Sequence, residues 1–263
     1  KDVNYLLLSP FIKNPKELAE WLGDSQNDSV SITINWSPTK QYVGCNLIKD
    51  NKTKSIVKYY PTPRNNILKD SVEIDLHVNP TEKKKELECR RIDYKLRAAI
   101  LIEKYIKLGS VLVVCRGADT CESYCSFAFK YLKNQGLIKN KEDDESIQKA
   151  IELVKFEMDE NDQLIEYLKY GMAFHHAKMP DLVKEIVEEL ISDKKIDIVF
   201  ATTTLGQGMN FPITTLIFAG LVVGKRETID TTTFWNFAGR AGRAYMDKEG
   251  HIIVMDATNK ADD

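Results

Sequence analysis

Short apolar runs alternate along this chain with longer amphipathic stretches. The runs at 111–115, 196–201, 214–220 and 251–255 have the length and the β-branched content of buried strands. Between them, apolar residues recur every three or four positions, as they do in helices that cover a sheet. This pattern predicts an α/β fold with a doubly wound, mainly parallel sheet and helices on both of its faces.

The first third of the chain adds a hairpin and further elements. Residues 41–48 and 54–60 alternate like strands and flank a polar cluster typical of a turn, which predicts a β-hairpin. We expect helices over residues 15–22 and from Thr81 to Gly109. Strands are expected at 4–8 and 30–34, and a surface loop from residue 60 into the polar residues that follow.

The stretch between Cys115 and His175 is longer than a single strand-to-strand crossover needs. Its helical spacing predicts an inserted helical segment at about residues 134–170. A helix is then expected from Asp181, with Leu182, Ile186 and Leu190 as one apolar row and Val183 and Val187 beside it.

Two segments of the last third contain candidate chemistry. The strand at 196–201 leads into threonines and two glycines, Gly206 and Gly208, and such residues let a phosphate approach the backbone and receive hydrogen bonds. Arg240 and Arg243 stand three apart, so on a helical turn both guanidiniums would point the same way toward a phosphoryl group. Because ligands bind beyond strand ends in open parallel sheets, we expect both segments to form one active edge.

Charge and cysteine content exclude few classes of function. A net charge of −2 gives no global basic surface, so any nucleic-acid binding must come from locally placed donors. No apolar run is long enough to span a membrane and no signal peptide is visible, so we expect a cytoplasmic protein. The five cysteines show neither a C-x-x-C pair nor a nearby histidine, which favours buried thiols over a metal site.

The segments 201–212 and 236–243 resemble motifs V and VI of superfamily-two helicases, the DEAD-box and DExH-box group. The sequence Gly171-Met172-Ala173-Phe174-His175-His176-Ala177 is similar to a stretch of the DExH-box, archaeal repair-helicase-like branch. The resemblance implies a C-terminal RecA-like lobe over residues 41–263, with the hairpin as a linker. Residues 1–40 would be the tail of the first RecA-like lobe and the interlobe linker.

What the resemblance implies for the site is specific. Arg240 and Arg243 would be arginine fingers on ATP. The residues lining the same cleft would be Gly208, Asn210, Asn236 and Gly239. Those contacting single-stranded nucleic acid, DNA or RNA, would be Arg116, Gly117, His176, Thr202 and Thr203. The adjacent His175 and His176 would point to opposite faces of a strand, one toward the core and one toward a ligand, while a purely structural role for both stays open.

Two motifs of the family are absent from this sequence. The chain contains neither the phosphate loop nor the magnesium-binding carboxylates of the family, so ATP and Mg²⁺ would be held mainly by the first lobe. We therefore expect an ATP-dependent helicase as the full-length protein and no activity from these 263 residues alone. The alternative is a helicase-derived module that binds nucleic acid or protein without using ATP.

Overall fold

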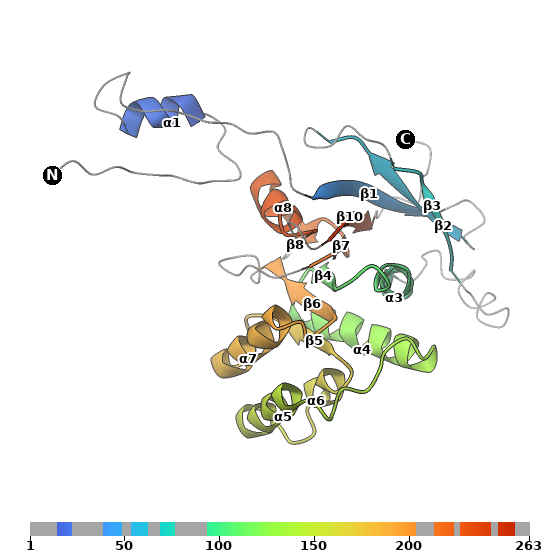
Figure 1. Ribbon diagram of the computed structural model, residues 1–263, viewed down its shortest axis with the longest axis vertical. Coiled ribbons are helices and arrows are strands. Elements are labelled where there is room, and N and C mark those ends of the chain that lie inside the picture. Colours follow the sequence, from blue (N-terminus) through green and yellow to red (C-terminus); the bar gives the residue numbers. More distant parts are fainter. Residues whose placement is uncertain are drawn as a thin grey trace.

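The computed structural model describes residues 15–22, 39–48, 54–62, 69–76, 94–203, 213–223, 227–242 and 247–255. Its centre is one sheet whose eight strands run in the order β3-β2-β1-β10-β7-β4-β6-β5 (Figure 1). The six strands from β1 to β5 in this order pair in parallel with one another. Strand β2 pairs antiparallel with β1, and β3 pairs antiparallel with β2. The predicted α/β class and mainly parallel sheet are confirmed.

The strand bounds follow the apolar runs closely. The strands of the large sheet are β1 (Lys40–Ile48), β2 (Lys54–Tyr60), β3 (Val72–Asp75), β4 (Val111–Cys115), β5 (Met172–His175), β6 (Ile198–Thr202), β7 (Thr215–Phe218) and β10 (Glu249–Met255). A separate small ladder pairs β8 (Val222–Val223) with β9 (Glu227–Thr228). The predicted hairpin is confirmed as β1 and β2, and it continues the large sheet through β1 and β10.

One expectation for this region was wrong. The polar residues after Tyr60 were expected to form only a surface loop, but β3 pairs with β2 there. Ile74 turns inward and is buried while Glu73 and Asp75 on either side are exposed, so the alternation was present but spans only four residues. The expected strands at 4–8 and 30–34, and the helical residues before Tyr94, lie outside the described residues.

The helices cover both faces of the sheet, as predicted. Besides α1 (Pro15–Leu22), which precedes the first strand in the chain, the helices are α3 (Tyr94–Tyr105), α4 (Ala118–Asn134), α5 (Glu145–Glu157), α6 (Gln163–Leu168), α7 (Asp181–Ser192) and α8 (Thr231–Ala238). The connection from β4 to β5 runs outward along the sheet and the one from β5 to β6 runs back, so right-handed crossovers place α4 and α7 on opposite faces. Figure 1 shows α3 with α4 on one side and α7 with α8 on the other.

Helix α7 differs from the predicted packing at one residue. Its buried residues are Val183, Val187, Leu190 and Ile191, whereas Leu182 is half exposed at 50%. The apolar stripe of this helix is wide enough to allow either orientation. The valine row is buried, Leu190 is buried and Ile186 is partly buried against the core, so the predicted row departs from the structure only at Leu182.

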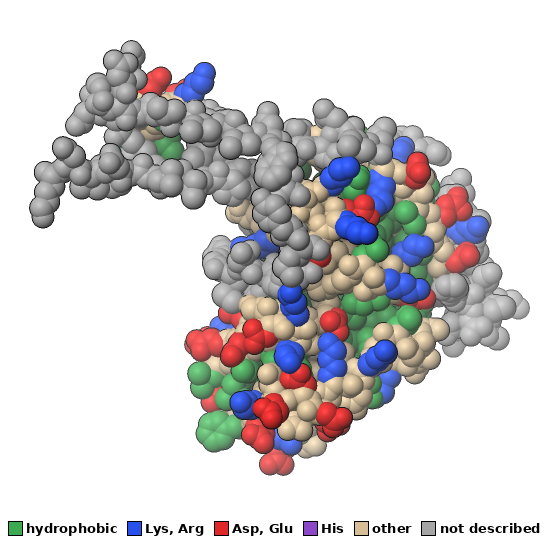
Figure 2. Space-filling view, in the orientation of Figure 1, with side chains coloured by type: hydrophobic (Ala, Val, Ile, Leu, Met, Phe, Trp, Pro, Cys, Tyr) green, Lys and Arg blue, Asp and Glu red, His purple; other side chains and the backbone are tan. Residues whose placement is uncertain are grey.

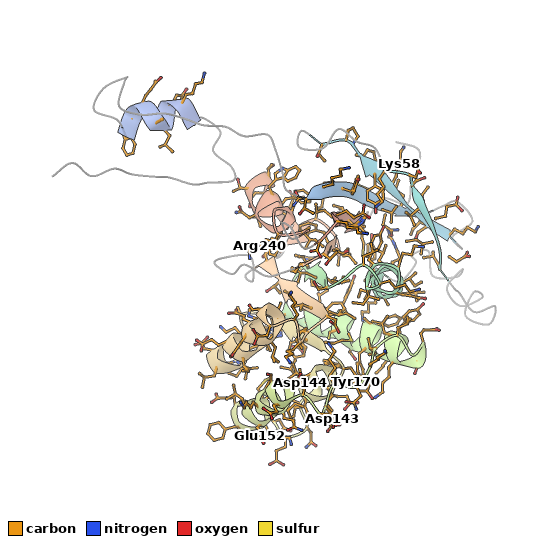
Figure 3. The ribbon with its side chains drawn as sticks, viewed as in Figure 1. Lys58, Asp143, Asp144, Glu152, Tyr170 and Arg240 are labelled. Carbon is orange, nitrogen blue, oxygen red and sulfur yellow. The ribbon has the colours of Figure 1, made fainter. Side chains whose placement is uncertain are left out.

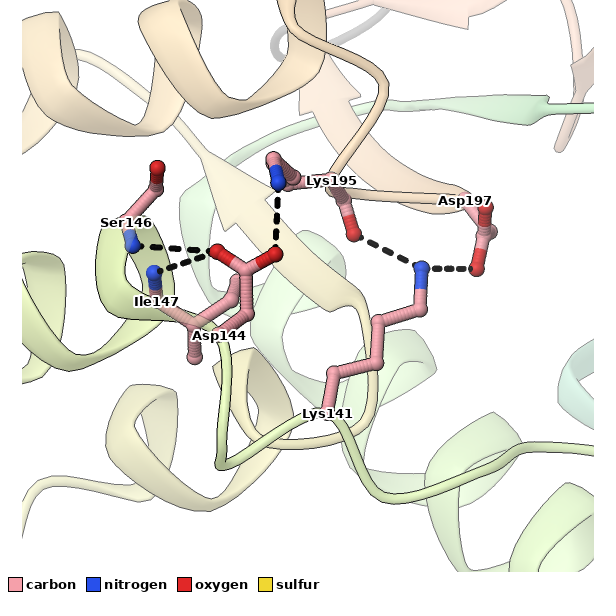
Figure 4. Close-up of polar contacts among 6 residues, drawn as sticks. All are labelled: Lys141, Asp144, Ser146, Ile147, Lys195 and Asp197. Atoms are coloured by element: carbon pink, nitrogen blue, oxygen red, sulfur yellow. Dashed lines mark hydrogen bonds and ion pairs between the residues drawn. The ribbon is translucent and has the colours of Figure 1, made fainter.

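The helical segment between α4 and β5 is anchored by a charge network (Figure 4). The Lys141 ammonium donates to Asp197 at 2.6 Å and to the Lys195 carbonyl at 2.8 Å. Lys195 donates in turn to Asp144, and the same Asp144 carboxylate caps the first turn of α5 by accepting two backbone N–H bonds. Because Asp197 directly precedes β6, the network fixes α5 beside the start of that strand.

The surface shows no single-sign field on the face drawn in Figure 2. Acidic and basic side chains are interspersed over the part formed by α5 and α7. Ion pairs such as Lys133–Glu166 and Lys178–Asp119 join exposed side chains, and exposed pairs of this kind contribute about 0–1 kcal/mol each. Within the described residues, no helix is both long enough and apolar enough to cross a membrane.

Candidate functional site

The five residues expected to contact nucleic acid all lie where β4, β5 and β6 end. Cys115, the last residue of β4, is directly opposite Thr202 at the end of β6, and His175 of β5 is opposite Ala201. These three strands are parallel neighbours, so their carboxyl ends meet at one edge of the sheet, which we call the carboxyl edge. The structure therefore brings together Arg116, Gly117, His176, Thr202 and Thr203.

The start of α4 is open at this edge. Gly117 is the N-cap of the helix in an extended conformation, no side chain caps it, and no atom lies within 4 Å of the place where a Cβ would be. Arg116 just before it is exposed. The backbone N–H groups of a helix start and the positive end of the helix dipole favour an anion at this point.

An ion pair stands at the rim of the same helix start. Asp119 in the first turn of α4 accepts a hydrogen bond from Lys178 at 2.7 Å, and both side chains are exposed. The Lys178 ammonium holds the pKa of Asp119 below its usual range. Lys178 therefore lies at the carboxyl edge, engaged with a carboxylate.

The two adjacent histidines do point to opposite faces of the sheet. Nε2 of His175 lies 2.8 Å from Glu188 of α7, and Nε2 of His176 lies 2.9 Å from Glu122 of α4. Both side chains are buried, at 4% and 3% exposure, so neither has the solvent-facing position expected for a ligand contact. Burial lowers the pKa of His175 below its ordinary value of 6.5. Phosphate contact by His176 stays a prediction.

His176 supports the carboxyl edge from within. Its ring stacks on Phe174 of β5, with an interplanar angle of 3° and a centroid separation of 5.3 Å. Thr202 is buried at 8% exposure and Thr203 is half-buried. The accessible polar groups of this edge are thus concentrated at Arg116, at Gly117 and around Thr203.

The first arginine of the arginine segment lies on a turn rather than on a helix. Helix α8 ends at Ala238, and residues 239–242, which we call the arginine turn, follow it. Ala241 forms a parallel bridge with Ile213, and the Gly242 N–H donates to the Ile213 carbonyl at 2.8 Å. Gly242 has φ +77, a conformation that favours glycine. Arg240 therefore lies on a turn after the helix, while Arg243 lies outside the described residues, so the shared direction of the two guanidiniums stays a prediction.

The arginine turn is packed closely against two strand starts. A Cβ on Gly242 would lie 2.8 Å from Gly250 Cα and 2.8 Å from Thr39 Cγ2. A Cβ on Gly250 would lie 2.5 Å from the Ala241 carbonyl oxygen. Two glycines facing each other therefore allow the turn to lie directly on the start of β10.

Gln41 of β1 holds the same turn. Its Nε2 donates to the Ala238 carbonyl at 3.1 Å and to the Ala241 carbonyl at 2.7 Å. Sequence reasoning missed this residue because the bonds join positions about two hundred residues apart and no local pattern announces them. The only sequence signal was a polar side chain at the beginning of a predicted strand.

Arg240 is the candidate arginine finger that the structure describes. Its side chain is half-buried beside the end of α8, and Nε donates to the Asn236 carbonyl at 3.2 Å (Figure 3). Burial lowers the pKa of the guanidinium from its ordinary value, although arginine stays charged in proteins. Asn236 and Gly239, both exposed, lie on the same segment. Arg243, Gly208 and Asn210 lie outside the described residues.

The two candidate regions lie at opposite ends of the sheet. Ile213, the partner of the arginine turn, precedes β7, so the turn lies where the parallel strands begin, which we call the amino edge. Thr202 and Thr203 lie at the other edge, because α8 carries the chain back across the sheet before Arg240. Gly206 and Gly208 lie outside the described residues, so their place beside the arginine turn stays a prediction. The strands between the edges have five residues or so, which corresponds to about 16 Å.

The cysteines contribute packing. Cys115, Cys121 and Cys125 are buried free thiols and Cys45 is half-buried. Burial raises the pKa of the Cys125 thiol, which keeps it protonated and unreactive. Among the described residues, no group of three or more His, Cys, Asp or Glu side chains is placed to hold a metal ion.

Known proteins show the same kind of domain. Residues 149–245 match the helicase conserved C-terminal domain. The chain is 28% identical over 268 residues to the Hachiman protein HamB of Bacillus cereus, across 97% of this chain and 23% of that protein. It is 34% identical over 145 residues to the antiviral helicase SKI2 of Saccharomyces cerevisiae, across 51% of this chain and 11% of that protein.

A third relative extends the same picture. The probable ATP-dependent DNA helicase HFM1 of Homo sapiens is 25% identical over 259 residues, across 96% of this chain and 15% of that protein. The chain thus spans less than a quarter of each of these three relatives. A doubly wound, mainly parallel sheet with helices on both faces is the architecture of a RecA-like lobe. The domain match and these relatives are consistent with a C-terminal helicase lobe of the superfamily-two, DExH-box type.

Proposed function

We propose that this chain is the C-terminal half of an ATP-dependent helicase or translocase that moves along single-stranded nucleic acid. The observation that supports this most is the separation of two polar regions by the length of one rigid sheet. Donors for a phosphate backbone gather at the carboxyl edge, and the arginine turn is fixed at the amino edge. One lobe can therefore contact two ligands at once without either blocking the other.

In this proposal the carboxyl edge holds the strand by its phosphates. Arg116 would contribute a charged fork, the start of α4 its backbone N–H groups, and Thr202 and Thr203 their hydroxyls. His176 would hold this edge in shape from beneath through Glu122 and Phe174. Phosphate contacts read no sequence, so binding should tolerate any sequence and weaken steeply with salt.

At the amino edge, Arg240 and Arg243 would reach ATP across the interlobe cleft as arginine fingers. Such arginines neutralise the charge of the transferred phosphoryl group and are worth about 10³ to 10⁵ in rate in other phosphoryl-transfer enzymes. Asn236, Gly239, Gly208 and Asn210 would line the same cleft. In this proposal Mg²⁺ and most of the phosphate contacts would be held by the first lobe, of which residues 1–40 would be the tail and the interlobe linker.

The proposal is tested by ATP turnover of the full-length protein without nucleic acid, with single-stranded DNA and with single-stranded RNA. We expect stimulation by at least one polymer, and a loss of the stimulated rate of about 10³-fold in Arg240→Ala or Arg243→Ala. The residues 1–263 alone should not turn over ATP. Lys130→Ala, an exposed position on α4 away from both edges, is the control and should match the parent.

Nucleic-acid affinity is the second measurement. Arg116→Ala should weaken binding about equally across sequences and lower the slope of log affinity against log salt by about one phosphate contact. Lys130→Ala should leave both unchanged. If no polymer stimulates turnover, or if the arginine variants keep a stimulated rate, the motor proposal fails. Retained binding with no turnover would then favour the module that binds nucleic acid without using ATP.

A further inference from the structure

The arginine turn is held by a side chain from the strand that follows the proposed interlobe linker. Gln41 is the second residue of β1, and Thr39, which packs over Gly242, directly precedes that strand. Gln41 also lies opposite Gly250 in the ladder between β1 and β10. The end of the linker segment, the start of β1 and the arginine turn therefore meet at one place.

The two bonds from Gln41 flank Arg240 on both sides. Ala238, whose carbonyl accepts at 3.1 Å, is the last residue of α8, and Ala241, whose carbonyl accepts at 2.7 Å, follows Arg240. One side-chain amide thus fixes the backbone before and after the guanidinium. Within the arginine turn, the backbone N–H groups of Arg240, Ala241 and Gly242 donate to the carbonyls of Phe237, Ala238 and Ile213, so what the Gln41 amide adds is a link from this turn to β1.

We infer that Gln41 is a positioning residue for ATP hydrolysis, which sets the arginine turn in its active geometry and links it to the interlobe linker. This inference rests on the proposed function. A group misplaced by about 1 Å can lose about 10²-fold in rate, so two side-chain bonds that fix the backbone around an arginine finger have a measurable effect on turnover. Movement of the first lobe would pull on the linker, and Gln41 would pass the displacement to Arg240.

The test uses the full-length protein with Gln41→Ala, Gln41→Asn and Gln41→Glu. Ala removes both donors, Asn shortens the reach, and Glu places a carboxylate against two carbonyl oxygens at the negative end of α8. We expect kcat for stimulated ATP turnover to fall about 10- to 100-fold in the Ala and Glu variants and less in Asn, with nucleic-acid affinity unchanged.

Gln148→Glu is the matched control. Gln148 on α5 also donates from Nε2 to a backbone carbonyl, that of Glu142 at 3.1 Å, but its bond is exposed and lies in the helical segment. The same substitution there should leave kcat as in the parent. A fall of equal size in Gln148→Glu would show that any lost amide bond slows turnover and would overturn the inference.

A double-mutant cycle separates positioning from general destabilisation. If Gln41 acts through the turn, Gln41→Ala should have no further effect on kcat in an Arg240→Ala protein. Additive losses would overturn the inference. A parental kcat in Gln41→Ala would overturn it too, while the losses in Arg240→Ala and Arg243→Ala would leave the proposed function standing.

Hydrogen exchange tests the contact without relying on turnover. The amides of Arg240, Ala241 and Gly242 are hydrogen-bonded in the turn and should exchange faster in Gln41→Ala than in the parent. Amides of β4 should not change. Unaltered exchange at the turn would show that Gln41 does not hold it, even if turnover fell. If the parent shows no stimulated turnover at all, the proposed function fails. Faster exchange of the turn amides in Gln41→Ala would then still confirm that Gln41 holds the arginine turn.

Discussion

The buried guanidinium of Arg97 allows a quantitative test of how the hairpin is attached. Arg97 of α3 is 1% exposed, and it donates from Nε at 3.1 Å and from Nη2 at 2.8 Å to the side-chain oxygen of Asn46 on β1. Nη2 also reaches the Asn46 backbone carbonyl at 2.6 Å. Asn46 in turn donates to Ser55 of β2 at 3.1 Å.

Asn46→Ala removes two bonds from a charged donor together with the bond to Ser55, and leaves only the backbone acceptor of that residue. Bonds to charged groups contribute about 1.5–3 kcal/mol each, and here the two share one oxygen, so we expect the free energy of unfolding to fall by about 3 kcal/mol. Ser55→Ala removes one bond between neutral groups and should cost about 1 kcal/mol. Urea unfolding followed by circular dichroism measures both.

A compensating variant tests the reasoning further. In Asn46→Leu combined with Arg97→Met, both polar partners become apolar, so the unfolding free energy should return to within about 1 kcal/mol of the parent. If Asn46→Ala cost no more than Ser55→Ala, the guanidinium would not depend on this oxygen. If the double variant were as unstable as Asn46→Ala, loss of shape rather than loss of the polar partner would be the cause.

Three further predictions concern stability. Thr215 is fully buried and its hydroxyl has no hydrogen-bond partner among the described residues, so Thr215→Val should raise the free energy of unfolding in urea by about 1 kcal/mol; a loss would contradict this. Asp144→Ala removes the cap of α5 and should cost about 1–2 kcal/mol, whereas the exposed neighbour Asp143→Ala should be neutral; equal costs would refute the cap. Burial lowers the pKa of His175 and His251 below 6.5, so the unfolded chain gains protons first as the pH falls. The stability that the two neutral histidines contribute to the fold is complete above about pH 6.5 and is lost as the pH falls below it. The urea midpoint should therefore be lower at acidic than at neutral pH, and a constant midpoint would contradict this.

Much of the fold could be predicted because apolar runs and helical spacing are local signals. The bounds of β4 and β2 follow directly from their sequences, and the residues expected to contact nucleic acid do meet at one edge. Parallel pairing explains this success, since every residue just after such a strand lies at the same end of the sheet.

The predictions that failed depend on contacts between distant residues. Nothing in the spacing of Arg240 and Arg243 shows that α8 ends at Ala238 or that Ala241 pairs with Ile213. The row that α7 buries was open in the sequence because two neighbouring rows were apolar, and only packing against the sheet selects one. The role of Gln41 could not be predicted for the same reason, because its hydrogen-bond partners come from the other end of the chain.

Because the two edges lie at opposite ends of one stiff sheet, a tilt of the lobe around the sheet centre moves them in opposite directions. For strands of about 16 Å, a tilt of about 10° around the sheet centre moves each end by about 1.4 Å, and the two ends move in opposite directions. In the proposed motor, a tilt that brings Arg240 toward ATP would therefore move the carboxyl edge in the opposite direction. Because the tilt is around the centre, the two displacements are equal in size, and for a given tilt angle the length of the strands sets how large they are.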